Sequence, residues 1–245
     1  MPSDPNKRKR VLEPRIDPQT KKMDIGGLTI PPTSLLTALL YGFAHHPKVI
    51  AKEYYFWRIC DELWNHEDLP EPMMVRHPWA EKMIRAALNN KYLSIGGSAS
   101  SGKSHTMAAW GIVNWLSQPR DTLVLMTSTT LREARKRIWG SVMSLLSVID
   151  GAPIKIRDSI GNAAYLDEKE TLIERAGLSL IAAEKQKTRD AVGKFIGLKQ
   201  KRVILIGDEL AELSEAIVNA GLTNLSKNPF FQMIGMSNPN SRFDA

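Results

Sequence analysis

The sequence predicts an α/β fold of three layers, α/β/α, in which helices flank a mainly parallel sheet. Three observations lead to this prediction. From residue 77 onward, short apolar runs typical of buried strands alternate with segments of helical length. A turn rich in glycine and serine, residues 97–104, joins the first of these strands to a helix. Two later apolar runs end in polar side chains, at 208–209 and 237–238, and the carboxyl ends of parallel strands meet at one edge of a sheet.

The composition is that of an ordinary globular protein. Hydrophobic residues make up 43% and charged residues 24% of the 245 residues, which suits one large α/β domain or two small ones. Cys60 is the only cysteine, so the chain can form no internal disulfide, in keeping with a reducing compartment. The sequence contains no apolar run of membrane-spanning length, and its charged, proline-rich start is unlike a signal peptide. We therefore expect a soluble cytoplasmic protein with no membrane partner.

The formal charge of +7 is concentrated in two stretches. Residues 1–23 contain seven basic and three acidic side chains, a net +4, and residues 184–202 contain seven basic and two acidic side chains, a net +5. Two interpretations are open for each stretch: a contact surface for a polyanion, or a solvated segment without a partner.

We expect three parts along the chain: a disordered basic arm at 1–32, a helical lead-in at 33–76 and a chemical domain at 77–245. Residues 1–32 contain six prolines and few apolar side chains to bury. Thr33 or Ser34 can cap a helix over residues 35–41, and Pro47 can open a second helix that reaches Trp64. The aromatic side chains of this second helix allow a base-stacking surface, but their helical spacing favours a hydrophobic core.

The chemical domain begins with a helix over residues 78–88 that leads into the strand before the glycine-rich turn. After the turn we expect a buried helix at 103–116, an apolar strand at 122–127 and a further helix that Ser128 or Thr130 can cap. The remaining predicted strands lie at 154–156, 171–173, 178–181, 203–210 and 230–237.

The turn at residues 97–104 fits the phosphate-binding pattern G-x-x-x-x-G-K-[ST] at every constrained position. Its glycines let backbone N–H groups point at a polyphosphate, and the following helix adds the positive end of its dipole. We expect Lys103 to reach the β- and γ-phosphates of ATP and the Ser104 hydroxyl to bind Mg²⁺. The predicted nucleotide-binding residues are Gly97, Ser98, Ala99, Ser100, Ser101, Gly102, Lys103 and Ser104.

The apolar run at 203–210 ends in two carboxylates, Asp208 and Glu209. A strand that ends in aspartate can hold the magnesium shell from the side opposite the phosphate loop, so we expect Asp208 to lie beside the strand that delivers Gly97. Glu209 can orient and deprotonate an attacking water molecule, which predicts a hydrolytic site.

The run at 230–237 ends in Ser237 and Asn238. A polar group at the tip of a strand beside the phosphate loop can sense the γ-phosphate and couple its loss to movement. An ordinary Asn-Pro turn is the alternative interpretation.

These segments together, residues 97–104, 197–209 and 233–239, resemble the ATPase domain of the large terminase subunit of tailed bacteriophages in order and spacing. In that family a glycine-containing turn precedes the Asp-Glu strand, and a later strand ends in a Gly-x-Asn-Pro-like coupling motif. The resemblance covers residues 78–244 and implies a three-layer P-loop NTPase fold of the catalytic-glutamate type. It implies an ATP hydrolase that moves double-stranded DNA into a procapsid.

Carried over by position, the resemblance implies roles for single residues. Lys103 is the catalytic phosphate lysine, Ser104 and Asp208 bind Mg²⁺, Glu209 is the catalytic base, and Ser237 and Asn238 belong to the coupling motif. The implied partners are a homo-oligomeric ring, usually a pentamer, the procapsid portal and a small terminase subunit.

Two features depart from the family pattern. Terminases often place a glutamine upstream of the phosphate loop to read adenine, whereas this sequence has Ala80 and Glu81 there, so base selectivity is not predicted. Family members usually continue into an RNase H-like nuclease domain, whereas this chain stops at Ala245. We therefore expect ATP hydrolysis from this chain and no nuclease activity.

Ring ATPases commonly complete a site with an arginine from the next subunit, which stabilises transition-state charge. Arg189 is the first candidate for this arginine finger, followed by Arg132 and Arg135. A solvated surface arginine is the alternative for each of them.

Two other functions remain open. The phosphate loop also suits another DNA-dependent translocase or helicase, and it suits a non-motor phosphotransferase such as a kinase. Duplex DNA should stimulate ATP turnover by a packaging motor and should leave a kinase unaffected.

Overall fold

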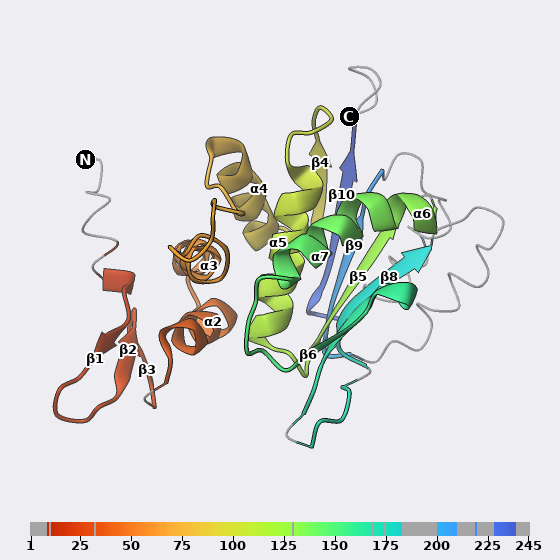
Figure 1. The fold of residues 1–245 in the computed structure, drawn as a ribbon. Coiled ribbons are helices and arrows are strands. Elements are labelled where there is room, and N and C mark those ends of the chain that lie inside the picture. The colour runs from red at the N-terminus through yellow and green to blue at the C-terminus, as the bar shows by residue number, and fades with distance from the viewer. Residues whose placement is uncertain are drawn as a thin grey trace. The chain divides into compact units, whose positions relative to one another are not determined.

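A seven-stranded sheet forms the centre of the second of two units into which the chain divides, Met1–His77 and Pro78–Ala245 (Figure 1). The chemical domain expected from the sequence begins at residue 77, one residue before the second unit. The computed structural model describes residues 9, 11–31, 33–128, 130–167, 169–173, 175–182, 200–209, 219 and 228–238.

The sheet has the strand order β4-β10-β9-β5-β8-β7-β6. Its first five strands are parallel to one another. Strand β7 pairs antiparallel with β8 and with β6, and β6 and β7 form a hairpin. The bounds are β4 (Tyr92–Gly96), β5 (Thr122–Ser128), β6 (Ile154–Arg157), β7 (Asn162–Tyr165), β8 (Gly177–Ala182), β9 (Arg202–Gly207) and β10 (Phe231–Ser237). The prediction of an α/β fold with a mainly parallel sheet is therefore confirmed.

The position of β9 differs from the sequence-based expectation. We expected Asp208, which follows β9, to lie beside the phosphate-loop strand β4, but β10 pairs with both and separates them. Both β9 and β10 are buried apolar strands, so hydrophobicity alone does not decide which of them is next to β4. As a result, the strand that ends at Asn238 is the direct neighbour of the strand that leads into the phosphate loop.

Helix α5 of this unit lies over the sheet, and α7 packs beside α5 (Figure 1). Gly111 of α5 marks a close approach to the sheet, since a Cβ there would lie 3.1 Å from a Val124 methyl group and 3.0 Å from the Met126 methyl group. The bounds are α4 (Pro78–Asn89), α5 (Lys103–Ser117), α6 (Leu131–Ala134), the π-helix η1 (Arg135–Trp139), α7 (Gly140–Leu146) and the 3₁₀ turn η2 (Asp158–Ile160). Residues 183–199 and 210–218 lie outside the described residues.

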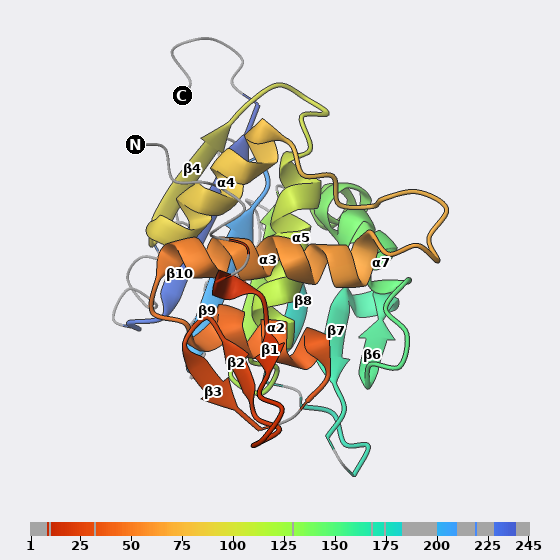
Figure 2. The ribbon, with the colours of Figure 1, turned by 90° about the vertical axis from the view of Figure 1, so that its left-hand side faces the viewer.

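The hairpin of β6 and β7 forms the edge of the sheet opposite β4 (Figure 2). Strands at 154–156 and 178–181 were expected and are present, whereas the expected strand at 171–173 is reduced to one bridge between Leu166 and Leu172. Strand β7 has no clear signal in the sequence, because Asn162, Ala163 and Ala164 have little strand propensity. Pairing with β6 and β8 overrides that preference.

The first unit contains the helices α2 (Leu35–His45) and α3 (Val49–Trp64) and a small antiparallel sheet. Ser34 caps α2, and its hydroxyl accepts a hydrogen bond from the Thr37 amide at 3.2 Å. The aromatic side chains Tyr55, Phe56, Trp57 and Trp64 of α3 are buried, as the core interpretation predicts.

The prediction of a disordered arm over residues 1–32 is wrong for its second half. The small sheet consists of β1 (Arg15–Ile16), β2 (Met23–Ile25) and β3 (Leu28–Ile30). Three of its apolar residues, Met23, Ile25 and Ile30, are buried, which a composition-based argument does not reveal. No helix of the described residues has the length and hydropathy needed to cross a membrane.

Candidate active site

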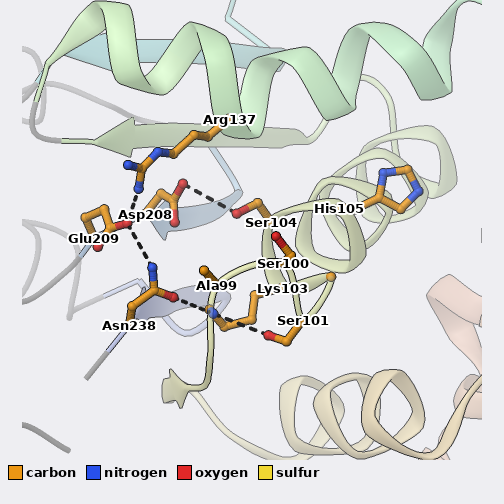
Figure 3. A pocket seen from close by; sticks show the side chains of 11 residues that line it. Ala99, Ser100, Ser101, Lys103, Ser104, His105, Arg137, Asp208, Glu209 and Asn238 are labelled. Atoms are coloured by element: carbon orange, nitrogen blue, oxygen red, sulfur yellow. Dashed lines mark hydrogen bonds and ion pairs between the residues drawn. The ribbon is translucent and has the colours of Figure 1, made fainter. Parts of the chain in front are cut away.

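A cavity of about 350 Å³ lies at the edge of the sheet where β9 and β10 end and α5 begins (Figure 3). The phosphate loop, the two carboxylates and the predicted coupling residue all line it, together with two residues that the sequence analysis did not select. The lining residues are Ala99, Ser100, Ser101, Gly102, Lys103, Ser104, His105, Arg137, Asp208, Glu209 and Asn238.

The backbone of the phosphate loop depends on left-handed conformations. Gly102, the N-cap of α5, has φ 79° and Ser100 has φ 60°. Gly102 adopts this conformation at little cost because it has no Cβ. The Gly97 amide donates to the Ser237 carbonyl at 3.3 Å, so the loop starts directly from the β4–β10 pair.

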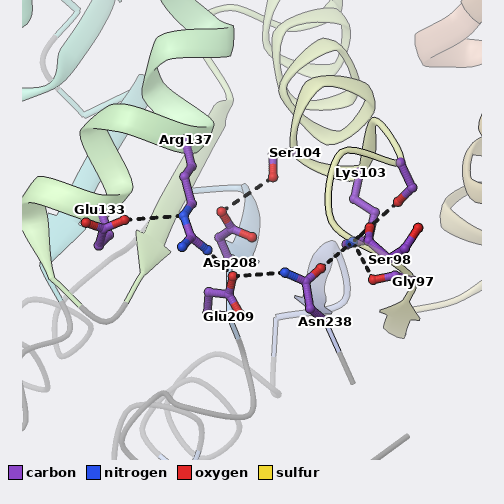
Figure 4. Close-up of polar contacts among 10 residues, drawn as sticks. Gly97, Ser98, Lys103, Ser104, Glu133, Arg137, Asp208, Glu209 and Asn238 are labelled. Atoms are coloured by element: carbon purple, nitrogen blue, oxygen red, sulfur yellow. Dashed lines mark hydrogen bonds and ion pairs between the residues drawn. The ribbon is translucent and has the colours of Figure 1, made fainter. Parts of the chain in front are cut away.

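Lys103 is almost fully buried and its ammonium group folds back onto the loop (Figure 4). The Nζ atom donates to the carbonyl oxygens of Gly97 and Ser98 and to Asn238 Oδ1, at 2.8 Å each. Burial lowers the pKa of Lys103, and the charges of Asp208 and Glu209 oppose that shift. An ammonium group held by neutral oxygens in this way can exchange some of them for phosphate oxygens.

Asp208 lies opposite the first turn of α5, and the Ser104 hydroxyl donates to its Oδ2 atom at 3.4 Å. Burial raises the pKa of Asp208, the neighbouring Glu209 raises it further, and Arg137 lowers it. A carboxylate and a hydroxyl are the hard oxygen ligands that Mg²⁺ prefers. Among the described residues, no group of three or more His, Cys, Asp or Glu side chains could hold a metal ion. Ser104 and Asp208 could therefore supply two ligands to an Mg²⁺ ion.

Glu209 has a strained backbone and two polar partners. Its φ of 56° is left-handed, which is uncommon for a residue with a Cβ and costs conformational energy. Its Oε1 atom forms an ion pair with Arg137 and accepts a hydrogen bond from Asn238 Nδ2 at 3.5 Å. Asn238 thus connects the phosphate lysine to the second carboxylate (Figure 4).

Arg137 is the charged residue of the cavity that the sequence analysis missed. It lies in the π-helix η1, and Glu133, one turn earlier, binds its Nε atom at 3.3 Å. In the sequence, Arg137 is one of several basic residues that follow the apolar run of β5. The carboxyl end of β5 reaches the same edge of the sheet as the cavity. A π-helical turn, which decides where each of them points, has no recognised sequence signal.

Of the candidate arginine fingers, Arg132 and Arg135 are not among the described residues that line this cavity. Arg132 is exposed and Arg135 donates to the Ser159 carbonyl, while Arg189 lies outside the described residues. A finger would act on a neighbouring subunit, so these placements leave the prediction open.

The described residues define an α/β domain in which a glycine-rich loop and an acidic pair lie at one edge of a mainly parallel sheet. Known structures share its α/β fold. The large terminase of bacteriophage HK97 superposes with a TM-score of 0.57 at 13% identity, covering 76% of this chain and 37% of that chain. An arginine-to-alanine variant of the large terminase ATPase domain of Thermus phage P74-26 gives a TM-score of 0.50 at 15% identity, covering 76% of this chain and 70% of that chain.

Those values show a shared fold at low sequence identity. The chain spans only 37% of the length of the HK97 protein. No protein-family model and no curated protein matches the sequence. The chain therefore has the fold of phage large terminase ATPase domains, and its activity has to be argued from its own residues.

Proposed function

We propose that this chain is the ATP-hydrolysing motor domain of a viral DNA-packaging terminase, which couples Mg-ATP hydrolysis to translocation of double-stranded DNA into a procapsid. One observation carries the proposal: Lys103, Ser104, Asp208, Glu209 and Asn238, from three separate segments of the chain, line one cavity. The fold shared with phage terminase ATPase domains supports the choice of a packaging motor over other P-loop enzymes.

Each residue has a part in hydrolysis. The N–H groups of residues 97–104 and the Lys103 ammonium bind the β- and γ-phosphates. The Ser104 hydroxyl and the Asp208 carboxylate would hold Mg²⁺, which neutralises phosphate charge when bound. Glu209 orients a water molecule and takes its proton as the water oxygen bonds to the γ-phosphorus and the bond to the β–γ bridging oxygen breaks.

Asn238 gives the site a path from hydrolysis to movement. Its side chain binds Lys103 through Oδ1 and Glu209 through Nδ2, and it directly follows β10. Loss of the γ-phosphate changes what Lys103 binds, so the Asn238 contact and the end of β10 respond to it. In the proposed assembly this response moves DNA within a homo-oligomeric ring that docks on a procapsid portal, with a small terminase subunit, in the host cytoplasm.

The proposal is tested by ATP turnover of the purified chain in Mg²⁺ buffer with duplex DNA, with single-stranded DNA and without DNA. We expect turnover to depend on Mg²⁺ and to rise with duplex DNA. The variant Lys103→Ala is the control for contaminating ATPases and should be inactive. Stimulation by single strands alone would indicate a helicase-like translocase instead, and turnover that needs a small phosphoryl acceptor would indicate a kinase.

A further inference from the structure

The turn between β6 and β7 contacts the helix segment that carries Arg137, although it lies outside the cavity. Trp139 Nε1 donates a hydrogen bond of 2.8 Å to Asp158 Oδ1, and the Arg135 guanidinium donates to the Ser159 carbonyl. Trp139 is buried, whereas Asp158 and Ser159 are exposed. The surface turn η2 therefore reaches into the packed side of the π-helix.

Those two contacts hold both ends of one short element. The π-helix η1 runs over Arg135–Trp139, so Arg135 is its first residue, Trp139 is its last and Arg137 is its midpoint. The Gly140 amide closes the segment by donating to the Arg135 carbonyl, five residues back, which is the hydrogen bond that defines a π-turn. The turn η2 thus holds the element that decides the direction of Arg137.

The direction of Arg137 matters because each residue in an α-helix is rotated by about 100° from the one before it. If η1 relaxed to a regular α-helix, the side chains after the change would shift by about that angle. Arg137 now binds Glu133 on its own helix and Glu209 across the cavity, and its charge lies close to Asp208. A rotated Arg137 would leave Glu209 and Asp208 without this cation.

We propose that Asp158 is a positioning residue for the active site: by binding Trp139 it fixes the π-helical register that brings Arg137 to Glu209. The inference rests on the proposed function, because it assigns a catalytic consequence to the placement of Arg137 beside Glu209. Asp158 is not among the described residues that line the cavity, so we expect its effect on turnover to pass through Arg137.

Steady-state ATP hydrolysis by the full chain tests this inference. Asp158→Ala removes the acceptor and Trp139→Phe removes the donor while keeping an aromatic ring, and we expect either change to lower kcat by about 2- to 30-fold. Asp158→Asn keeps an acceptor oxygen and should retain the wild-type kcat. Nucleotide Kd should stay the same in all three, because the phosphate loop is untouched. Asp167→Ala is the control for loss of a loop hydrogen bond elsewhere, since Asp167 accepts from the Thr171 amide at 2.8 Å, and it should leave kcat unchanged.

A double-mutant cycle separates positioning from general destabilisation. In an Arg137→Ala background, Asp158→Ala should change kcat by less than twofold, because the residue through which it acts is gone. The same fold-change in both backgrounds, or a wild-type kcat for Asp158→Ala alone, would overturn the inference.

A second measurement needs no hydrolysis and so keeps the two proposals apart. The Arg137 Nε–H resonance in an ¹⁵N spectrum, assigned by its loss in Arg137→Lys, should shift in Asp158→Ala and stay in place in Asp158→Asn. An unchanged resonance in Asp158→Ala overturns the positioning role even if the chain hydrolyses ATP. Absence of turnover by the wild type together with a shifted resonance overturns the proposed function and leaves the placement of Arg137 by Asp158 intact.

Discussion

At the scale of single residues, the site depends on polar side chains that bind one another. Lys103, Asn238, Glu209 and Arg137 form one continuous chain of contacts along the cavity. Each of these contacts involves a charged group, and such hydrogen bonds are stronger than neutral ones. Changing one member should therefore affect its neighbours as well as the nucleotide.

Asn238→Ala tests this chain at its centre. We expect kcat for ATP hydrolysis to fall about tenfold or more, since the change removes a hydrogen bond from a lysine and one from a carboxylate. Nucleotide affinity should change less, because residues 97–104 remain. Fluorescent-nucleotide titration and turnover measured on the same preparation check the two parts. An unaltered kcat would mean that Asn238 only ends a strand.

Asp208 predicts a pH effect on stability. Its pKa is raised from 3.8 because burial and the nearby Glu209 disfavour the charged form. A raised carboxyl pKa means that the folded state binds the proton more tightly, so this residue costs no stability at low pH. As the pH rises from the ordinary pKa to the raised pKa of the folded state, Asp208 lowers the free energy of unfolding progressively. This loss of stability remains at every higher pH.

Removing this charge should therefore stabilise the nucleotide-free chain. We expect the Tm difference between Asp208→Asn and the wild type to be more positive at neutral pH than below the ordinary pKa. Thermal melts at several pH values measure it, and Asp167→Asn is the surface control. A difference that stays constant with pH would contradict the shift. The same variant should bind Mg-ATP more weakly, because it loses a charged ligand.

At the scale of elements, the helix α5 and the loop before it were the most predictable parts of the chain. The sequence predicts a helix at 103–116, and α5 covers Lys103–Ser117. Strands β5 and β10 also match their expected ranges closely. Long apolar runs with clear boundaries define these elements locally, so little information from the rest of the fold is needed.

Gly102→Ala tests the backbone of the loop. A side chain at φ 79° is strained, so we expect a loss of about 1–3 kcal/mol in the free energy of unfolding and a weaker affinity for nucleotide. Gly27→Ala is a matched control, because Gly27 has φ 94° and, like Gly102, nothing within 4 Å of the added Cβ. Chemical denaturation should show similar losses for both variants, and only Gly102→Ala should weaken nucleotide binding. If Gly102→Ala bound nucleotide as tightly as the wild type, the left-handed conformation at Gly102 would not be required for nucleotide binding.

The elements that the sequence did not predict depend on contacts between distant residues. The π-helix η1 and strand β7 are both short, and both are held by partners far along the chain: η1 by the turn η2, and β7 by β6 and β8. The small sheet at Arg15–Ile30 has few apolar residues, but three of them, Met23, Ile25 and Ile30, are buried. Arg137 was missed for the same reason, since its direction is a property of η1 and not of local sequence.

At the scale of the whole molecule, the order of the strands in the sheet could not be predicted from the sequence. Three motifs identified Lys103, Asp208, Glu209 and Asn238, and the sheet brings all four to one cavity. Their relative positions depend on β10 lying between β4 and β9, which chain order does not reveal. Residue chemistry was thus predictable from short patterns, and site geometry required the topology.

The basic N-terminal stretch gives a prediction for the full chain. Removing residues 1–10, which include four consecutive basic residues at 7–10, should weaken duplex DNA binding and flatten its salt dependence. Each phosphate contact that is lost reduces the slope of log K against log salt by about 0.9. A salt titration of DNA affinity with and without these residues measures the change. If the two titrations gave the same affinities and slopes, residues 1–10 would be a solvated segment that does not contact DNA.

The central claim is that this cavity hydrolyses ATP with Glu209 as the base, and Glu209→Gln tests it most directly. The amide is similar in size to the carboxylate and cannot accept the proton of the attacking water. We predict that this variant binds Mg-ATP as the wild type does, while its turnover falls by about 10²- to 10⁴-fold. Turnover at the wild-type rate by Glu209→Gln would contradict the account.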